Sequence, residues 1–319
     1  MYRRRMLALA TSMVTLAACG GASTPGKGPA AGGPVTPTAG ISTTPTGSTG
    51  GTATASTTTT PETASAAALP AVSTTSRPAT GAAALSDEFD ATASLKKWTR
   101  YEPAPAVFES LKVDAGIGAL RVKPSKSVWY NGERGLALLK VVDGDFMVTL
   151  RVRADGRVSA HPATAFSLVG VVMSAHYSAA EKAAGALADW VYLTTGSDEA
   201  GDPVIDSKFT IQNASDYIPY QAAWGWVELR AVRVGDQVTH LWRPDGGQWR
   251  VVRTMTLPRL PAVLDVGPNF LTAFNGDKPN LDASVDYIRF APVTADNDLQ
   301  TKLYYGKATD AEVLAAFGK

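Results

Sequence analysis

Hydrophobic and polar residues alternate in short runs over residues 85–293, a pattern typical of β-strands with one buried face. Pairs of turn-forming residues, such as Asp143-Gly144 and Gly235-Asp236, separate several of these runs. The runs predict strands at residues 107–113, 119–122, 136–141, 146–153, 166–173, 190–195, 208–212, 226–234, 238–243, 249–256, 270–274 and 285–290. Many short strands joined by tight hairpins favour an all-β fold, a single antiparallel β-sandwich.

Two segments have the sequence of a capping box, in which Ser or Thr is followed three residues later by Glu. Ser178 and Glu181 precede an alanine-rich stretch, which predicts a short surface helix ending near residue 188. Thr309 and Glu312 begin a stretch with apolar residues at helical spacing. We expect this second helix, in a C-terminal extension at 294–319, to pack against the sandwich; docking of a partner protein is the alternative.

The 166–173 strand is apolar on both faces, so we expect another segment to cover its outer face. The long connection at residues 174–189 is the candidate for that cover.

Residues 20–84 consist almost entirely of Gly, Ala, Ser, Thr and Pro. The only charged residues in this segment are Lys27, Glu62 and Arg77, and the segment contains no aromatic residue. Such a segment buries too little apolar surface to offset the conformational entropy of ordering it, so it is predicted to be disordered. A flexible chain of this length spans about 45 Å on average. We interpret it as a tether that holds the following domain away from its point of attachment.

Within residues 1–19, three arginines at positions 3–5 precede an apolar stretch at residues 6–18, which is followed by Cys19. The stretch is too short to span a bilayer, which is typical of a signal peptide. The sequence Leu-Ala-Ala before Cys19 resembles the lipobox of bacterial lipoproteins, which implies that Cys19 is lipidated and becomes the N-terminus. An ordinary secretory signal that contains a cysteine is the alternative. Several acyl chains would anchor the protein permanently, and Gly20 after the cysteine resembles the sorting signal for the outer membrane.

Cys19 is also the only cysteine, which excludes an intramolecular disulfide and a thiolate metal cluster. An exported domain without disulfides must be stabilised by its own core. The chain has 30 basic and 29 acidic residues, a net charge of +1. A nucleic-acid-binding surface would need a strong basic excess or stripe, so nucleic acid is excluded as a partner.

The order of several motifs within residues 85–293 resembles that of a known superfamily. These motifs are Asp87-Glu88-Phe89-Asp90, Trp98, a glycine-to-proline stretch at 118–124, Gly144-Asp145-Phe146, the strand residues at 190–193 and 226–230, and Val285-Asp286-Tyr287-Ile288. The order resembles the concanavalin A-like lectin/glucanase superfamily, and within it the laminin-G-like and regulation-of-enolase-1-like domains. The resemblance implies a jelly roll of two curved antiparallel sheets. The superfamily includes carbohydrate-binding modules, glycoside hydrolases and domains without a known ligand, so the fold leaves function open.

No catalytic pattern is visible in the sequence. A retaining glycosidase needs two carboxyl groups about 5–5.5 Å apart, and the E-x-D-x-E strand of the superfamily's family-16 hydrolases is absent. The three histidines, His161, His176 and His240, lie far apart, and no nucleophile or phosphate-loop motif occurs. We therefore expect a protein that is not an enzyme. A hydrolase whose two carboxylates come from different strands is the alternative.

Strand alternation indicates candidate ligand-binding residues. At residues 190–195, the aliphatic side chains form one face, and Trp190 and Tyr192 lie on the other. Aromatic rings beside polar groups suit sugars, because pyranose C–H faces stack on rings while hydroxyls form directional hydrogen bonds. Packing within the sandwich is the alternative role for these rings. Loop residues that could surround the same groove are Trp129, Tyr130 and His176.

A structural Ca²⁺ is a further hypothesis, because Asp87, Asp90 and Asp286 lie near the two ends of the domain and supply the hard oxygen ligands that the ion prefers. No other cofactor is expected. The sequence thus predicts a monomeric outer-membrane lipoprotein, attached to the membrane through Cys19, whose lectin-like domain binds a glycan or cell-envelope polysaccharide without cleaving it. A structural or protein-interaction module is the second hypothesis, and a glycoside hydrolase is the third.

Overall fold

The computed structural model describes residues 77–319, apart from the side chains of Lys182 and Ala183. The predicted signal peptide, Cys19 and most of the predicted tether lie outside the described residues. Within them, no helix is both long enough and apolar enough to cross a bilayer.

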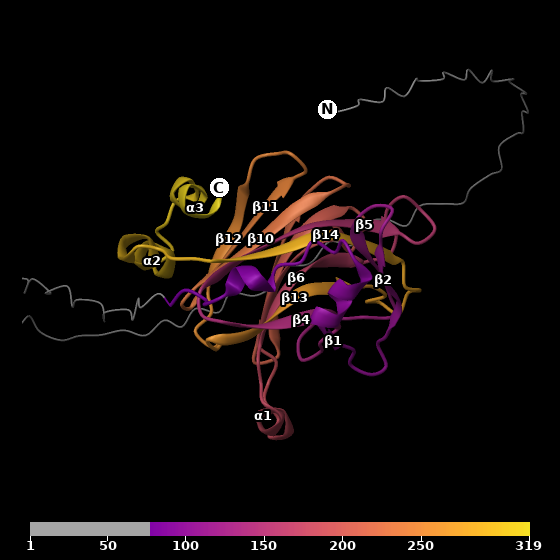
Figure 1. The fold of residues 1–319 in the computed structure, drawn as a ribbon, viewed down its shortest axis with the longest axis horizontal. Coiled ribbons are helices and arrows are strands. Elements are labelled where there is room, and N and C mark those ends of the chain that lie inside the picture. The colour runs from indigo at the N-terminus through magenta and orange to yellow at the C-terminus, as the bar shows by residue number, and fades with distance from the viewer. Residues whose placement is uncertain (1–76) are drawn as a thin grey trace, which may run out of the picture. The chain divides into compact units, whose positions relative to one another are not determined.

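Among residues 77–319, fourteen strands form two seven-stranded sheets, and every pairing between these strands is antiparallel (Figure 1). The first sheet has the order β1 (Thr99–Tyr101), β4 (Leu136–Asp143), β13 (Val263–Leu271), β6 (Leu168–Ala175), β7 (Trp190–Ser197), β8 (Pro203–Ile211) and β9 (Ala214–Gln221). The second sheet has the order β12 (Arg250–Thr256), β11 (Gln237–Pro244), β10 (Val227–Val234), β5 (Phe146–Gly156), β14 (Leu281–Pro292), β3 (Ala119–Pro124) and β2 (Phe108–Asp114). The predicted antiparallel β-sandwich is confirmed.

The main hydrophobic core lies between the two sheets, and strand alternation decides which residues enter it. In β7, Val191 and Leu193 belong to this core, and in β10 the core residues are Leu229 and Ala231. The intervening residues of both strands lie on the outer faces of the sheets. These are the faces that the alternation in the sequence predicts.

Each predicted strand corresponds to an observed one, but β1 and β9 were not predicted. β9 is an edge strand that is exposed along almost its whole length and contains Pro219, so it lacks the alternation of a half-buried strand. β13 lies earlier in the chain than the predicted strand at 270–274. It contains Gly267 and Pro268, which usually interrupt strands, and neither residue pairs with β4.

Three α-helices accompany the sheets. The first, α1 (Ala179–Ala183), is shorter than predicted and lies at the tip of a hairpin-like extension that projects away from both sheets (Figure 1). Near the C-terminus, α2 (Asn297–Tyr304) was not predicted, whereas α3 (Asp310–Phe317) begins with the predicted capping box. Val313 and Phe317 of α3 are buried against Val232 and Leu241 of the second sheet. The expected packing of the C-terminal helix on the sandwich is confirmed.

The described residues from Arg77 onward pack with the sandwich, although they lie before the predicted start of the domain at residue 85. Asp145, just before β5, holds this segment: its carboxylate accepts a hydrogen bond from the Arg77 amide (2.7 Å), and its backbone pairs with Arg77 and Ala79. The same carboxylate also accepts the Gly235 amide (2.7 Å). Ala79 and Ala82 are buried, because their small side chains fit against the core. Composition alone does not distinguish these alanines from those of the preceding segment.

Candidate ligand-binding pocket

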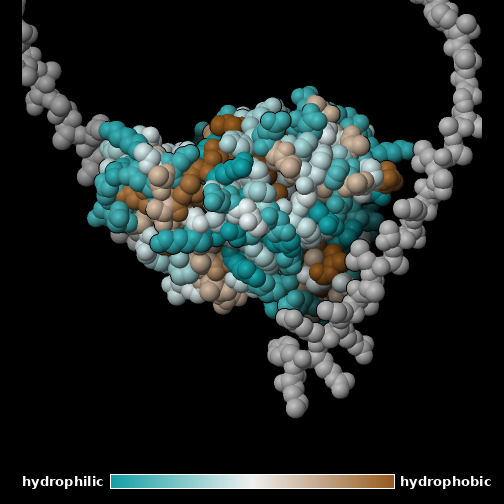
Figure 2. All heavy atoms as spheres, turned by 90° about the horizontal axis from the view of Figure 1, so that it is seen from above, coloured by the Kyte–Doolittle hydropathy of each residue, from teal (hydrophilic) through white to brown (hydrophobic). Residues whose placement is uncertain are grey.

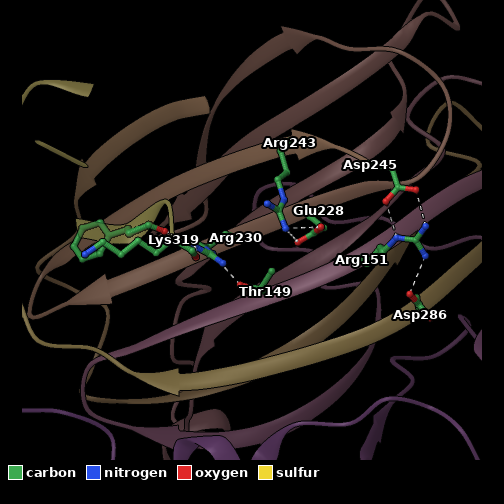
Figure 3. Close-up of polar contacts among 9 residues, drawn as sticks. Thr149, Arg151, Glu228, Arg230, Arg243, Asp245, Asp286 and Lys319 are labelled. Atoms are coloured by element: carbon green, nitrogen blue, oxygen red, sulfur yellow. Dashed lines mark hydrogen bonds and ion pairs between the residues drawn. The ribbon is translucent and has the colours of Figure 1, made fainter. Parts of the chain in front are cut away.

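The outer face of the second sheet is occupied by its own side chains and by the C-terminal helices. Arg243 donates to both carboxylate oxygens of Glu228 (2.8 and 2.7 Å), and Arg151 bridges Asp245 and Asp286 (2.8 Å each; Figure 3). Nearer the C-terminus, Arg230 donates to Thr149 Oγ1 (2.9 Å) and to the carbonyl oxygens of Phe317 and Lys319 (Figure 3). Its guanidinium and that of Arg243 also lie 4.1 and 4.6 Å from the Trp249 ring centre.

These contacts connect neighbouring strands and attach α3. Figure 2 shows that, on one side of the molecule, hydrophobic residues form small separate patches among hydrophilic ones. Within the part of the chain that the structure describes, the outer face of the first sheet is the better candidate for ligand binding.

The outer face of the first sheet carries a second cluster of apolar side chains, which includes three of the predicted ligand-binding residues. Trp190 and Tyr192 lie on this face, as alternation predicts, with stacked rings 5.4 Å apart. Trp129 packs edge-on against Trp190, with ring centres 5.5 Å apart. All three residues are buried. Trp190 is therefore part of a packed aromatic cluster, and its ring is not exposed for a sugar to stack on.

Trp129 belongs to the segment between β3 and β4, and this segment covers the outer face of β6. Ser127 fixes one end, because its hydroxyl donates to the Phe270 carbonyl oxygen (2.5 Å) and its backbone pairs with Thr272. Farther along, the Asn131 amide donates to Ser215 Oγ (2.8 Å). The 174–189 connection, which the sequence suggested as the cover, contributes Ala188 to the cluster but carries α1 away from the sheets.

Beside Trp129, this face contains an open pocket of about 180 Å³, which we call the aromatic pocket. Its lining combines six aromatic rings with three ionisable side chains and one leucine: Trp129, Tyr130, Phe166, Tyr192, Tyr217, Phe274, Glu199, Asp206, Lys208 and Leu271. A neighbouring hollow of about 200 Å³ shares four of these residues and adds Asp198. Tyr130 and Tyr217 are 42% and 48% exposed, so both tyrosines are partly accessible to a ligand.

Asp206 of β8 is the buried carboxylate of the aromatic pocket. Tyr192 donates its hydroxyl to Asp206 Oδ2 (3.0 Å), whereas Oδ1 is buried without a hydrogen-bond partner among residues 77–319. Burial disfavours the ionised carboxylate and raises its pKa to about 6. Burial also raises the pKa of Tyr192 well above its usual value. Oδ1 is an unused acceptor that suits a hydroxyl donor from a ligand.

Lys208 lies two residues along the same strand and on the same face as Asp206. Its ammonium group lies 4.4 Å from the Tyr130 ring centre and 6.0 Å from those of Tyr192 and Tyr217. Burial lowers the pKa of Lys208. Perturbed pKa values that gather in one pocket are typical of functional sites.

The sequence indicated part of the aromatic pocket. Trp129, Tyr130 and Tyr192 line it, and Trp190 lies behind Tyr192. The prediction omitted Asp206, because the predicted strand began at Lys208, and it omitted Tyr217, because β9 was not predicted. The available signal for these residues was their spacing. Asp206 and Lys208 lie two residues apart, so their side chains share one face of a strand, and Tyr192 lies on the same face of the sheet.

His176 is not among the residues that line the aromatic pocket. It lies at the base of the extension that carries α1, and its Nδ1 contacts Asp265 Oδ1 at 2.7 Å. The other two histidines are placed differently. His161 stacks on Trp224 with ring centres 4.5 Å apart, and His240 is buried between the sheets with its Nδ1 2.7 Å from Ser207 Oγ.

The three aspartates proposed as calcium ligands have different surroundings: two contact other protein groups and the third is exposed. Asp87 accepts hydrogen bonds from the Trp98 indole (3.1 Å) and the Phe89 amide (3.0 Å). Asp286 forms an ion pair with Arg151, and Asp90 is exposed. Among residues 77–319, no three His, Cys, Asp or Glu side chains gather in an arrangement that could hold a metal ion. The calcium site stays a prediction from the sequence.

Comparisons with known proteins give no family. No family model and no curated protein matches the chain. Among solved structures, a protein of unknown function from Saccharomyces cerevisiae has a TM-score of 0.48 and 15% identity over 63% of this chain and 99% of its own.

Two other solved structures are named for carbohydrate-related proteins. A Lotus tetragonolobus seed lectin has a TM-score of 0.40 and 11% identity over 62% of this chain and 99% of its own. A mutant of a GH43 protein from Bacillus licheniformis has a TM-score of 0.44 and 12% identity, over 65% of this chain and 39% of its own. These weak likenesses do not identify a ligand.

Proposed function

We propose that this chain is an exported lipoprotein whose sandwich binds a glycan of the cell envelope, without cleaving it, in the aromatic pocket. One observation carries the proposal: Asp206 Oδ1 is a buried acceptor with no partner among residues 77–319, and it lies in a pocket walled by aromatic rings. Sugars present apolar C–H faces to rings and hydroxyl groups to polar atoms, so they match both parts of this lining.

The polar residues give the pocket both kinds of hydrogen-bonding group. Asp206 accepts hydrogen bonds, and the ammonium group of Lys208 donates them. A sugar ring that packs on the exposed Tyr217 would have its hydroxyls near Asp206 and Lys208, which line the same pocket. Anchoring rests on the sequence alone: lipidation of Cys19 would attach the protein to the membrane, and residues after it would act as the tether.

A glycan-array screen of residues 20–319, which lack the lipidated cysteine, tests this proposal. We expect binding to at least one glycan, and we expect the Tyr217→Ala variant to lose about tenfold in affinity, because a stacked ring contributes roughly 0.5–1.5 kcal/mol and buries apolar area besides. The matched control is Tyr304→Ala, which removes a tyrosine of similar exposure on α2. No binding to any glycan would refute the proposal.

A glycoside hydrolase is the second candidate, because Glu199 shares the aromatic pocket with Asp206. A carboxyl group with a pKa of about 6 could act as a general acid near neutral pH. Release of reducing ends from the bound glycan, abolished in both Asp206→Asn and Glu199→Gln, would support the hydrolase. Binding without release supports the non-catalytic proposal.

A further inference from the structure

A straight row of residues crosses the outer face of the first sheet and ends in the aromatic pocket. The cross-strand register pairs Asn269 of β13 with Gly170 of β6, Gly170 with Thr194 of β7, and Thr194 with Asp206 of β8. Residues directly opposite one another in a sheet point to the same face. We call Asn269, Thr194 and Asp206 the polar row.

Every member of the polar row has hydrogen-bonding atoms without a partner. Thr194 and Asn269 are 0% exposed and Asp206 is 3% exposed. Among residues 77–319, the buried atoms without a partner include Asp206 Oδ1, Thr194 Oγ1, and both Asn269 Oδ1 and Nδ2. Buried polar groups are almost always hydrogen-bonded in native proteins, so three consecutive exceptions in one row need an explanation.

The surroundings of the polar row place it beside the aromatic pocket. Leu271 lies two residues from Asn269 on the same face of β13, and it lines the pocket together with Asp206. Gly170, in the middle of the row, carries no side chain, and the backbone of β7 at Leu193 and Thr194 approaches it closely. Trp129 lines the pocket and belongs to the apolar cluster on this face, and its indole Nε1 also has no hydrogen-bond partner within the described part of the chain.

We propose that the polar row is an inner subsite of the aromatic pocket, reached when the Trp129 indole moves aside, and that it recognises the hydroxyl groups of a neutral sugar. The proposal rests on the glycan-binding function proposed above and names its ligand class. Asp206 Oδ1 and Asn269 Oδ1 need donors, Asn269 Nδ2 needs an acceptor, and Thr194 can be either. A hydroxyl group both donates and accepts, so a set of hydroxyls satisfies all four atoms.

Charged sugars fit the same row less well. A carboxylate only accepts hydrogen bonds, so the carboxylate of a uronate placed at this row would satisfy neither acceptor oxygen and would put an anion beside Asp206. An ammonium group only donates hydrogen bonds, so the ammonium group of an amino sugar placed there could not satisfy Asn269 Nδ2. At this position the polar row therefore favours hydroxyl groups over a carboxylate or an ammonium group.

The Thr194→Val substitution tests this inference, because it keeps the shape of the side chain and removes the unpartnered hydroxyl. We expect it to weaken binding of neutral array glycans by roughly fivefold to tenfold and to raise the Tm of residues 20–319 by roughly 2–4 °C. The Tm should rise because an unsatisfied buried hydroxyl destabilises the fold.

Thr210→Val is the matched control. Thr210 is equally buried on β8, but its hydroxyl is bonded to Ser215 Oγ at 2.6 Å. This variant should lower the Tm, since it removes a hydrogen bond that is made.

The outcomes separate the two proposals. The inner subsite is overturned if Thr194→Val binds neutral glycans as tightly as the wild type, or if its Tm is lower. Either result leaves the proposal of glycan binding intact. Equal binding to uronate-containing or amino-sugar glycans also overturns it. Loss of array binding in Tyr217→Ala but not in Thr194→Val locates the ligand in the outer pocket alone. No binding by the wild type overturns both proposals.

Discussion

Acidification should destabilise the sandwich through His240, which lies between the two sheets. Its ring is fully buried, Nδ1 contacts Ser207 Oγ, and Nε2 has no hydrogen-bond partner among residues 77–319. Burial, with a smaller contribution from Arg253, lowers its pKa from 6.5 to about 3. The folded protein therefore holds His240 neutral at a pH where the unfolded chain binds a proton. Below pH 6.5 the unfolded state gains protons first, so stability falls as the pH falls towards 3.

The magnitude follows from proton linkage. One pKa unit corresponds to about 1.4 kcal/mol, and the imidazole of the unfolded chain is about one-quarter protonated at pH 7, so between pH 7 and 4.5 the His240 contribution is a loss of about 2.5 kcal/mol. Asp206 acts in the opposite direction, because its pKa is raised from 3.8 to about 6. The folded state takes up that proton first, which adds about 2 kcal/mol of stability by pH 4.5. The two effects partly cancel in the wild type, so each must be measured in a variant.

The assay is urea unfolding of residues 20–319 at pH 7 and pH 4.5, with the wild type and three variants. His240→Asn cannot titrate but keeps a polar group near Ser207, and it should lose about 2.5 kcal/mol less on acidification than the wild type. Asp206→Asn lacks the compensating gain and should lose about 2 kcal/mol more. His161→Asn is the control, because His161 is exposed. A wild type and a His240→Asn variant with the same pH dependence would refute the reasoning.

Two further predictions concern the sheet and the anchor. Gly170→Ala should be severely destabilising, because an added Cβ would collide with the Leu193 carbonyl oxygen in the neighbouring strand. A Tm unchanged within about 1 °C would contradict the described register of β6 and β7. Cys19→Ser should move the protein from the detergent phase to the aqueous phase when expressing cells are partitioned with Triton X-114, because the single cysteine carries the predicted lipid anchor. Retention of the variant in the detergent phase would exclude lipidation at Cys19.

The local pattern of residues was sufficient to predict most of the sandwich. The faces of β7 and β10 follow from strand alternation, and the start of α3 follows from the reciprocal bonds between Thr309 and Glu312. Strand β9 has no such pattern, because an exposed edge strand needs no buried face and tolerates Pro219.

The candidate site was predicted only in part, because it depends on contacts between distant segments. Alternation placed Trp190 and Tyr192 on the outer face of the first sheet, but it could not show that Trp129, about 60 residues earlier, packs edge-on against Trp190. Likewise, the sequence shows Asp206 as one carboxylate among 29 acidic residues. Only the fold buries it among residues that are distant in sequence; that burial raises its pKa, and among residues 77–319 one of its oxygens has no hydrogen-bond partner.

The attachment of Arg77 to Asp145 has a mechanical consequence. Asp145 binds the Arg77 amide with one carboxylate oxygen and the Gly235 amide with the other, and its backbone also pairs with Arg77 and Ala79. A pulling force that arrives through the chain before Arg77 therefore acts first on this group of hydrogen bonds. From there the load passes to β5, which lies between β10 and β14 in the second sheet. Tension is thus shared by several strands before it reaches the pocket on the other sheet.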